Sequence, residues 1–177
     1  MSISANAPLP PPTGRYVLDP SDSTVTFVTK HMFGLGRVRG RFALSRGSVV
    51  IAERAEDSSA QAEISASSFS TRNPLRDVQV RSSLFLNARR HPAISFRADG
   101  VRRLGGTWVA TGTLTVKGKS APVELTVTSI ERVDATTVFT AHGTIDRYAH
   151  GITMMRGMAA RHLSFDITAH ATKAYTA

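Results

Sequence analysis

The stretch FSTRNPLRDVQVRSSLFLNARRHPAISF, residues 69–96, is the only segment that brings helical signals into an otherwise strand-like sequence. Asn73 is a good helix N-cap, and Pro74 suits the first helical position, where its missing N–H would have had no partner. The helix is expected to be short and to end near Ser82. Everything outside this stretch is expected to be β.

This helix carries two pairs of side chains at helical spacing. Leu75 and Val78 lie three residues apart and share one face. Asp77 and Arg81 are spaced i,i+4, which predicts an ion pair that contributes about 0.2–0.5 kcal/mol. We interpret that ion pair as structural.

A second helical turn is predicted directly after the first. Ser83 can cap it, and three consecutive apolar residues follow at positions 84–86. Pro92 favours an extended conformation for the residue before it, so the next strand is expected to begin there. Because three apolar residues in a row have to cover something apolar, we interpret residues 74–88 as a lid over the mouth of a barrel or the open end of a sandwich.

The strands are predicted from period-two alternation and turn signals. The clearest case runs from Gly36 to Ser45, where Val38, Gly40, Phe42 and Leu44 face one side and Arg37, Arg39 and Arg41 face the other. Such alternation is typical of antiparallel sheets with one buried face. Strands are expected near residues 23–30, 36–45, 48–51, 60–66, 93–104, 107–116, 120–131, 136–146 and 161–171.

This spacing indicates an all-β fold, either a sandwich or a barrel. A small antiparallel barrel is preferred, because it has no edge to protect and about eight strands enclose room for one small ligand. We therefore predict an antiparallel barrel of about eight strands with a short helical insertion at about 74–88.

Four sets of residues, in order along nearly the whole chain after residue 15, point to one family. They are Tyr16, Leu18, Asp19, Pro20, Ser23, His31, Gly40 and Phe42; then Thr71, Arg76, Asp77, Arg81, Ser82, Phe85, Leu86, Pro92, Ile94 and Phe96; then Gly112, Leu114, Thr115, Val116, Gly118 and Val123; and finally Arg147 with Gly151. Together they resemble the YceI-like proteins, a family that binds polyisoprenoid lipids in a lipocalin-like barrel.

The resemblance implies a lipocalin-like barrel and a bound isoprenoid-type lipid. It implies that three polar residues, His31, Arg81 and Arg147, have a role at the mouth of the barrel. Taken from the sequence alone, His31 is interpreted as a capped or surface loop residue, and each arginine could equally hold the insertion onto the barrel. The resemblance also implies that many relatives are exported.

Length and composition indicate the number of domains, the location and the kinds of site that the chain can have. A chain of 177 residues with 41% hydrophobic residues is long enough for one domain, expected at 15–177, after a disordered Pro-rich tail at 1–14. No apolar run approaches the length of a membrane span, and the N-terminus lacks the basic and apolar regions of a signal peptide, so we expect a cytoplasmic protein. The absence of cysteine excludes disulfides, thiol nucleophiles and thiolate metal sites.

The net charge of +9 would suit nucleic acid, an anionic lipid or an acidic partner. Arginine supplies 18 of the 22 basic residues, and they are dispersed along the chain. Dispersed charges favour a solvated surface, and no nucleic-acid recognition motif accompanies them.

The sequence contains few residues whose type and spacing suggest catalytic chemistry. The six histidines show no zinc-ligand spacing, although three brought together by folding could still form a site: His31, His91, His142, His150, His162 and His170. No nucleophile elbow, phosphate loop or dinucleotide fingerprint occurs. We predict a binding protein rather than an enzyme, with no cofactor, no metal and no catalytic residue.

A cavity is predicted because the inward positions mix large aromatic residues with small ones. Small residues such as Ala62, Ala66 and Ala169 should open a lumen among aromatic walls, and Met154, Met155 and Met158 suit an adaptable apolar lining. The candidate ligand-binding residues are Phe27, His31, Phe42, Phe69, Arg81, Phe85, Phe96, Trp108, Ala110, Gly112, Leu114, Arg147 and Phe165.

Three functions remain open at this point. The first is a lipid-binding module, the second is a basic protein that contacts nucleic acid or an anionic membrane, and the third is a hydrolase or isomerase without a familiar motif. We expect a small lipid ligand and no nucleic-acid partner. Transient membrane contact, a homodimer, and the choice among carrier, store and sensor are left open.

Overall fold

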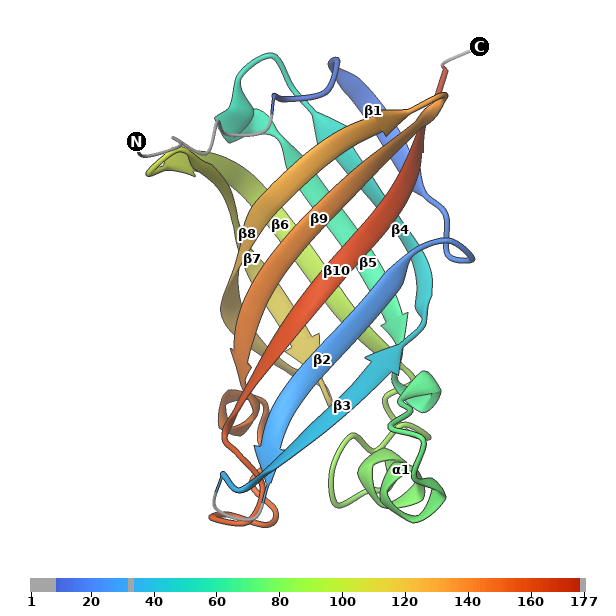
Figure 1. Cartoon of the computed structure of the whole chain (residues 1–177), viewed down its shortest axis with the longest axis vertical. Helices are drawn as coiled ribbons and strands as arrows, with labels where there is room; N and C mark the ends of the chain where they lie inside the picture. Colours follow the sequence, from blue (N-terminus) through green and yellow to red (C-terminus); the bar gives the residue numbers. More distant parts are fainter. Residues whose placement is uncertain (1–8, 32–33, 176–177) are drawn as a thin grey trace.

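The computed structural model describes residues 9–31 and 34–175 and consists mainly of antiparallel strands (Figure 1). The strands are β1 (Gly14–Leu18), β2 (Thr24–His31), β3 (Gly36–Phe42), β4 (Leu44–Ile51), β5 (Ser59–Ser65), β6 (Ala93–Leu104), β7 (Thr107–Val116), β8 (Lys119–Val133), β9 (Thr136–Asp146) and β10 (His162–Lys173). The helical elements are α1 (Pro74–Arg81) and the short 3₁₀ helices η1 (Ala55–Asp57), η2 (Ala66–Ser68) and η3 (Arg147–His150). No helix in this part of the chain is long and apolar enough to cross a bilayer.

The strands close into the predicted eight-stranded antiparallel barrel. Their order is β1, β4, β5, β6, β7, β8, β9, β10, and β10 returns to β1. β10 pairs with β1 where Ala171 lies opposite Leu18, and with β2 where Ser164 lies opposite Val28. β1 and β2 therefore occupy successive parts of one position beside β10, and β3 pairs with β2.

The two ends of the barrel are closed differently (Figure 1). We call the end that holds α1, the β2–β3 turn and the segment between β9 and β10 the mouth end, which is at the bottom of Figure 1. We call the opposite end, with the β6–β7 and β8–β9 turns and η1, the far end. Long connections gather at the mouth end, and these connections build the site.

The predicted alternation is confirmed on the strands that line the interior. On β10 the inward residues are Leu163, Phe165, Ile167 and Ala169. On β3, Val38 is buried while Arg37, Arg39 and Arg41 are exposed. The period of two therefore separates core from solvent as expected for a closed antiparallel sheet.

The single strand predicted over residues 36–45 is divided between β3 and β4. At the break, the Ala43 N–H donates to Ser68 Oγ at 2.7 Å. Arg41 and Ser70 exchange two backbone hydrogen bonds of 2.9 and 3.0 Å. The segment between β5 and β6, residues 66–92, which we call the insertion, thus satisfies backbone groups of β3 that another strand would otherwise pair.

The first predicted helix is confirmed as α1. Asn73 Oδ1 accepts a hydrogen bond of 3.1 Å from the Arg76 N–H, which satisfies one of the free donors of the first turn. The helix ends at Arg81, and Ser82 is the C-cap in extended conformation.

The predicted ion pair between Asp77 and Arg81 is wrong, since no such pair is present among the described residues. Asp77 is buried, and its Oδ1 accepts hydrogen bonds from the N–H and the hydroxyl of Thr71, at 2.9 and 2.6 Å. Burial acts to raise the pKa of Asp77, but the Thr71 hydrogen bonds lower it overall. The local capping contact therefore replaces the solvated i,i+4 pair.

The second predicted helical turn is also wrong. Residues 83–86 form hydrogen-bonded turns, and the Ser82 carbonyl accepts from the N–H groups of both Phe85 and Asn87. Asn87 has a φ of 49°, a left-handed conformation that a helix cannot continue through. Phe85 and Leu86 are nevertheless buried in the core, as their apolar character predicts.

The Pro-rich tail predicted at residues 1–14 falls mostly on residues 1–8, which lie outside the described residues. Of the rest, Tyr16 Oη donates a hydrogen bond of 2.7 Å to the carbonyl of Pro12, and Pro11 is buried. This contact holds residues 9–13 against the start of β1.

Candidate ligand-binding cavity

The mouth half of the barrel encloses a cavity of about 660 Å³. Six phenylalanines line it, all of them predicted as ligand-binding residues: Phe27, Phe42, Phe69, Phe85, Phe96 and Phe165. Leu114, also predicted, lines the same cavity, with further aliphatic residues of the strands that were not among the predicted ligand-binding residues. The cavity is therefore almost entirely apolar.

An aromatic cluster forms the wall next to the insertion. The Phe27 and Phe69 rings stack with centroids 5.2 Å apart, and Phe42 lies 5.6 Å from Phe27 and 5.4 Å from Phe69. Phe27 lies opposite Gly40 in the β2–β3 register, and a Cβ at Gly40 would collide with the Phe27 ring. Gly40 thus lets the ring lie flat against β3 and meet Phe69.

A second cavity of about 780 Å³ lies toward the far end. Trp108 and Ala110, predicted as ligand-binding residues, line this cavity rather than the one at the mouth. Six residues line both cavities and form a waist between them: Leu18, Ala62, Phe96, Leu125, Ile167 and Ala169. The two spaces are therefore adjacent along the barrel axis.

Gly112 lines neither of these two cavities. A Cβ at Gly112 would collide with the Arg97 carbonyl oxygen and lie 2.8 Å from the Cα of Ala98, both on β6. The β6–β7 register shifts between Ala98 and Gly100. Instead of opening the lumen, Gly112 allows the two strands to approach closely at this bulge.

Arg81 lies outside the residues that line the two cavities. Its guanidinium donates two hydrogen bonds to the Phe69 carbonyl oxygen, one of them from Nε at 3.0 Å. Because Phe69 is part of the aromatic cluster, Arg81 ties α1 to the cavity wall. Of the two roles considered for this residue, the structure places it in the one that holds the insertion.

Arg147 does line the cavity, and it is 8% exposed. Its guanidinium donates to four backbone carbonyls, at distances of 2.8 to 3.1 Å, from Ile152, Met154, Ala159 and Ala160. The guanidinium also lies 4.9 Å from the centre of the Tyr148 ring. Burial lowers the pKa of Arg147, but a guanidinium stays protonated at neutral pH. Arg147 therefore organises the segment between β9 and β10 from within.

His150 lines the cavity and is 2% exposed, and sequence reasoning did not single it out. Its Nδ1 lies 2.8 Å from the Lys119 carbonyl oxygen. A carbonyl only accepts, so the neutral ring carries its proton on Nδ1 and leaves Nε2 as an acceptor. Within the described part of the chain, Nε2 has no hydrogen-bond partner. Every side-chain nitrogen or oxygen there that lacks a partner is reached by solvent, and this holds for Nε2 as well. Nε2 is thus available to a hydroxyl or N–H group of a ligand.

The sequence feature that could have identified His150 is its position between Arg147 and Gly151. η3 ends at Gly151, whose φ of 70° turns the chain back so that His150 packs inward. Arg161 closes the same segment from outside by donating to both oxygens of Asp146, at 2.6 to 3.0 Å. The Arg161 hydrogen bonds lower the pKa of Asp146 to about 2.

Polar residues occur at the opening of the cavity, among them Lys30, Asn73, Arg76 and Gln79. The predicted residue His31 ends β2 beside this opening, but its side chain lies outside the described part of the structure. Met155 and Met158 line the rim and are partly exposed, while Met154 lies outside the lining. Among the described residues, no carboxylate lines the cavity, and no group of three His, Asp or Glu side chains could hold a metal ion.

Solved structures share this architecture. BcnA of Burkholderia cenocepacia superimposes with a TM-score of 0.78 at 25% identity, over 88% of this chain and 99% of BcnA. A polyisoprenoid binding domain from Saccharophagus degradans, implicated in plant cell wall breakdown, gives 0.64 at 16% identity, over 90% and 98%. The YceI protein of Campylobacter jejuni gives 0.61 at 21% identity, over 82% and 90%. The last two likenesses show the fold alone.

Sequence relatives and a family model agree with the fold. UPF0312 proteins of Pectobacterium carotovorum subsp. carotovorum and Azotobacter vinelandii are 32% and 31% identical over 109 and 112 residues, or 59% and 61% of this chain. These matches cover 57% and 58% of the relatives, so the chain spans a little over half the length of the curated relatives it matches. The model of the YceI-like domain matches residues 16–172. Because that match covers most of the chain, the predicted resemblance is confirmed and the chain belongs to the YceI-like domain family.

Proposed function

We propose that the protein binds a long-chain isoprenoid or a similar amphipathic lipid inside the barrel. The chain of the lipid lies in the apolar cavity, and its polar head lies near His150. The observation that carries this proposal is a cavity lined by six phenyl rings and by His150, whose Nε2 is available as an acceptor. Each buried methylene contributes about 0.8 kcal/mol, so a long chain needs few polar contacts for tight binding.

The waist between the two cavities supports a ligand longer than one cavity. Ala62 and Ala169 are small, so the waist is narrowed mainly by Leu18, Phe96 and Leu125. β10, with 12 residues, spans roughly 40 Å along its length at about 3.3 Å per residue. A chain that enters at the mouth and passes the waist would fill both cavities.

Family membership supports the same ligand class. The Saccharophagus degradans domain, whose fold this chain shares, is a polyisoprenoid binding domain. We infer binding rather than catalysis, since the described cavity wall pairs no carboxylate with His150. Carriage, storage and sensing all require this binding step.

The proposal is tested with one substitution at the waist. Ala62→Phe should block the passage while the barrel stays folded, because the added ring enters open space on both sides of the waist. Lipid extracted from the purified protein is identified by mass spectrometry, and binding of added geranylgeraniol is measured by competition with a fluorescent fatty acid. We expect the affinity of the variant to fall at least about tenfold, which corresponds to a loss of about 1.4 kcal/mol.

The matched control is Ala93→Phe, the same change at an exposed position of β6. It should bind like the wild type. If the wild type carries no lipid and binds no geranylgeraniol, or if Ala62→Phe is folded and binds with unchanged affinity, the barrel is not a lipid site of this kind.

A further inference from the structure

The mouth end carries all of the net positive charge of the protein. It is formed by residues 29–31, 34–42, 66–95, 116–121 and 144–163. These segments hold 14 of the 22 basic residues and two of the 13 acidic ones, a net charge of +12. The remaining 8 basic and 11 acidic residues leave the rest of the chain at −3. The charges dispersed along the sequence are therefore gathered at one end by the fold.

The two acidic groups at this end do not neutralise its surface. Asp77 is buried and accepts hydrogen bonds from Thr71, while Asp146 is paired with Arg161. The exposed arginines of β3 differ: within the described part of the chain, the side chains of residues 37, 39 and 41 make no ion pair or hydrogen bond. They are free to meet an anionic partner.

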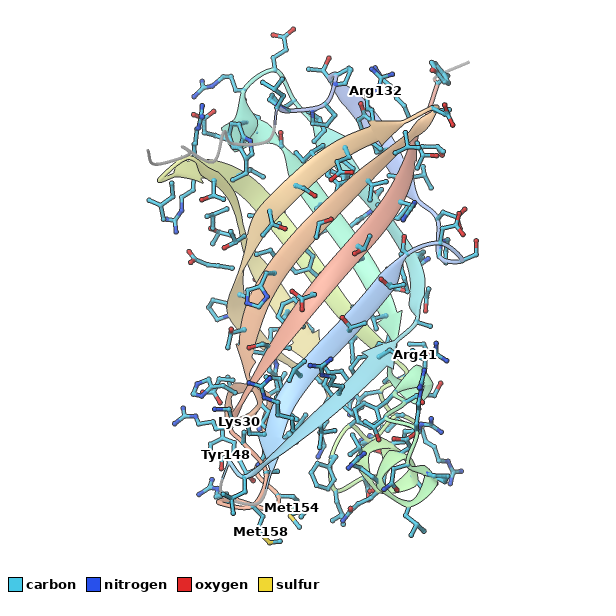
Figure 2. The ribbon with its side chains drawn as sticks, in the orientation of Figure 1. Lys30, Arg41, Arg132, Tyr148, Met154 and Met158 are labelled. Carbon is cyan, nitrogen blue, oxygen red and sulfur yellow. The ribbon has the colours of Figure 1, made fainter. Side chains whose placement is uncertain are left out.

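Exposed apolar side chains project from three segments of the same end. Leu35, in the β2–β3 turn, is 89% exposed, and Leu75 on α1 is 86% exposed. Val78 on the same face of α1 is 68% exposed, so most of the surface of the apolar pair of α1 meets solvent. Figure 2 shows Met154 and Met158 at the outermost tip of the mouth end, beyond Lys30 and Tyr148.

Apolar tips surrounded by cationic side chains are the pattern of a protein surface that rests on an anionic bilayer. The far end also exposes apolar residues, Leu104 at the end of β6 and Val133 at the end of β8. Glu131 and Asp134 lie beside Val133 in the β8–β9 hairpin, and the chain outside the mouth end has a net charge of −3. The far end thus lacks the charge complementarity that the mouth end has.

We propose that the mouth end docks on an anionic bilayer surface. The apolar tips enter the headgroup region, the arginines of β3 contact lipid phosphates, and the cavity opening lies against the lipid. This inference goes beyond the proposed function, because docking can be measured on protein that holds no lipid in its barrel. A nucleic-acid partner would use the same arginines but would give no role to the exposed leucines and methionines.

The test measures flotation of the protein with vesicles. Vesicles of phosphatidylcholine alone are compared with vesicles that contain about one third phosphatidylglycerol. The charge variant is R37Q/R39Q/R41Q, and its matched control is R15Q/R97Q/R132Q, which removes three exposed arginines away from the mouth end. We expect the charge variant to bind anionic vesicles at least about tenfold more weakly, and the control to bind within about twofold of the wild type.

The apolar tips are tested separately with L35Q/V78Q, at two exposed positions that do not line the cavity, against L104Q/V133Q at the far end. Only the mouth-end pair should weaken vesicle binding, by several-fold, at unchanged urea midpoints. Equal binding to neutral and anionic vesicles, or equal losses in both triple variants, would overturn the proposal. So would tight binding of duplex DNA that the charge variant loses while L35Q/V78Q still floats like the wild type. Any of these results, with co-purified lipid unchanged, leaves the proposed ligand site intact.

Discussion

The mouth end and the far end of the barrel share the same strands but differ in the connections between them. At the far end, tight turns join β6 to β7 and β8 to β9, with left-handed residues such as Gly105 and Asp134. At the mouth end, the insertion and the segment between β9 and β10 are long, and they supply Arg81, Arg147 and His150. Both ends enclose a cavity, so the strands they share create the enclosed volume. Most polar side chains of the candidate site lie on the long connections of the mouth end.

The largest expected difference between the ends concerns Arg147. Arg147→Ala removes a buried guanidinium that satisfies four carbonyls, and we expect it to reduce the free energy of unfolding by about 3–5 kcal/mol. At the far end, the exposed Arg132 (labelled in Figure 2) is the control, and Arg132→Ala should change stability by less than about 0.5 kcal/mol. Urea unfolding measures both. If the two variants lose similar amounts of unfolding free energy, Arg147 does not stabilise the segment between β9 and β10.

A smaller effect is expected at the contact between the insertion and the cavity wall. Arg81→Ala removes two charge-assisted hydrogen bonds to the Phe69 carbonyl, which should cost about 2 kcal/mol. The exposed Arg15 on β1 makes no comparable contact in the described structure, and Arg15→Ala is the control. Faster proteolysis between α1 and β6 in Arg81→Ala would show that the insertion is released locally. If proteolysis is unchanged and stability falls equally in both variants, Arg81 does not anchor the insertion.

The next largest effect is expected at the polar contact between His150 and the ligand. His150→Phe removes the acceptor Nε2, and we expect geranylgeraniol to bind about 5–10-fold more weakly, the value of roughly one hydrogen bond. The methyl ether of geranylgeraniol has no donor, so its affinity should stay within about twofold. Ile130→Val in the far cavity is the control and should affect both compounds equally. Equal losses for alcohol and ether in His150→Phe would mean that His150 acts only through packing.

The same contrast separates what the sequence predicts from what it does not. Period-two alternation predicts the inward residues of β10 and the bounds of β9, because in a strand each side chain's face depends only on its position. It misses the break at Ala43, since Ser68, which satisfies that N–H, lies 25 residues away. It likewise predicts a second helical turn at 83–86, because apolar composition does not reveal the left-handed Asn87.

At the site, the sequence indicates which phenyl rings face the cavity, on the strands and on the insertion alike, but not what the polar side chains of the long connections contact. The six phenylalanines and Leu114 line the mouth cavity as their positions indicate. His150 was missed because its burial depends on how η3 folds back, and Arg81 turned out to bind a backbone carbonyl. Gly112 shows a different limit: a small residue can make room for a neighbouring strand instead of a ligand.

The smallest expected effect is a pH dependence confined to the mouth end. Hydrogen bonds from Arg161 lower the pKa of Asp146 from 3.8 to about 2, so the folded state favours the ionised carboxylate. The stabilisation is complete above the ordinary pKa and is lost as the pH falls through about 2.

Because the Arg161 side chain is 55% exposed, solvent screening reduces the contribution of this ion pair to about 1 kcal/mol. Asp146→Asn should therefore lower stability by about 1 kcal/mol at pH 7 and by only a small part of that near pH 2, where about half of the folded wild-type protein has a protonated Asp146. The control pair on the barrel wall, Arg46 and Glu63, is more exposed, and Glu63→Gln should change the unfolding midpoint less at every pH. Urea midpoints measured between pH 2 and pH 7 decide the point: a difference between Asp146→Asn and wild type that stays constant across this range would show that the Asp146 carboxylate stabilises the segment through shape alone.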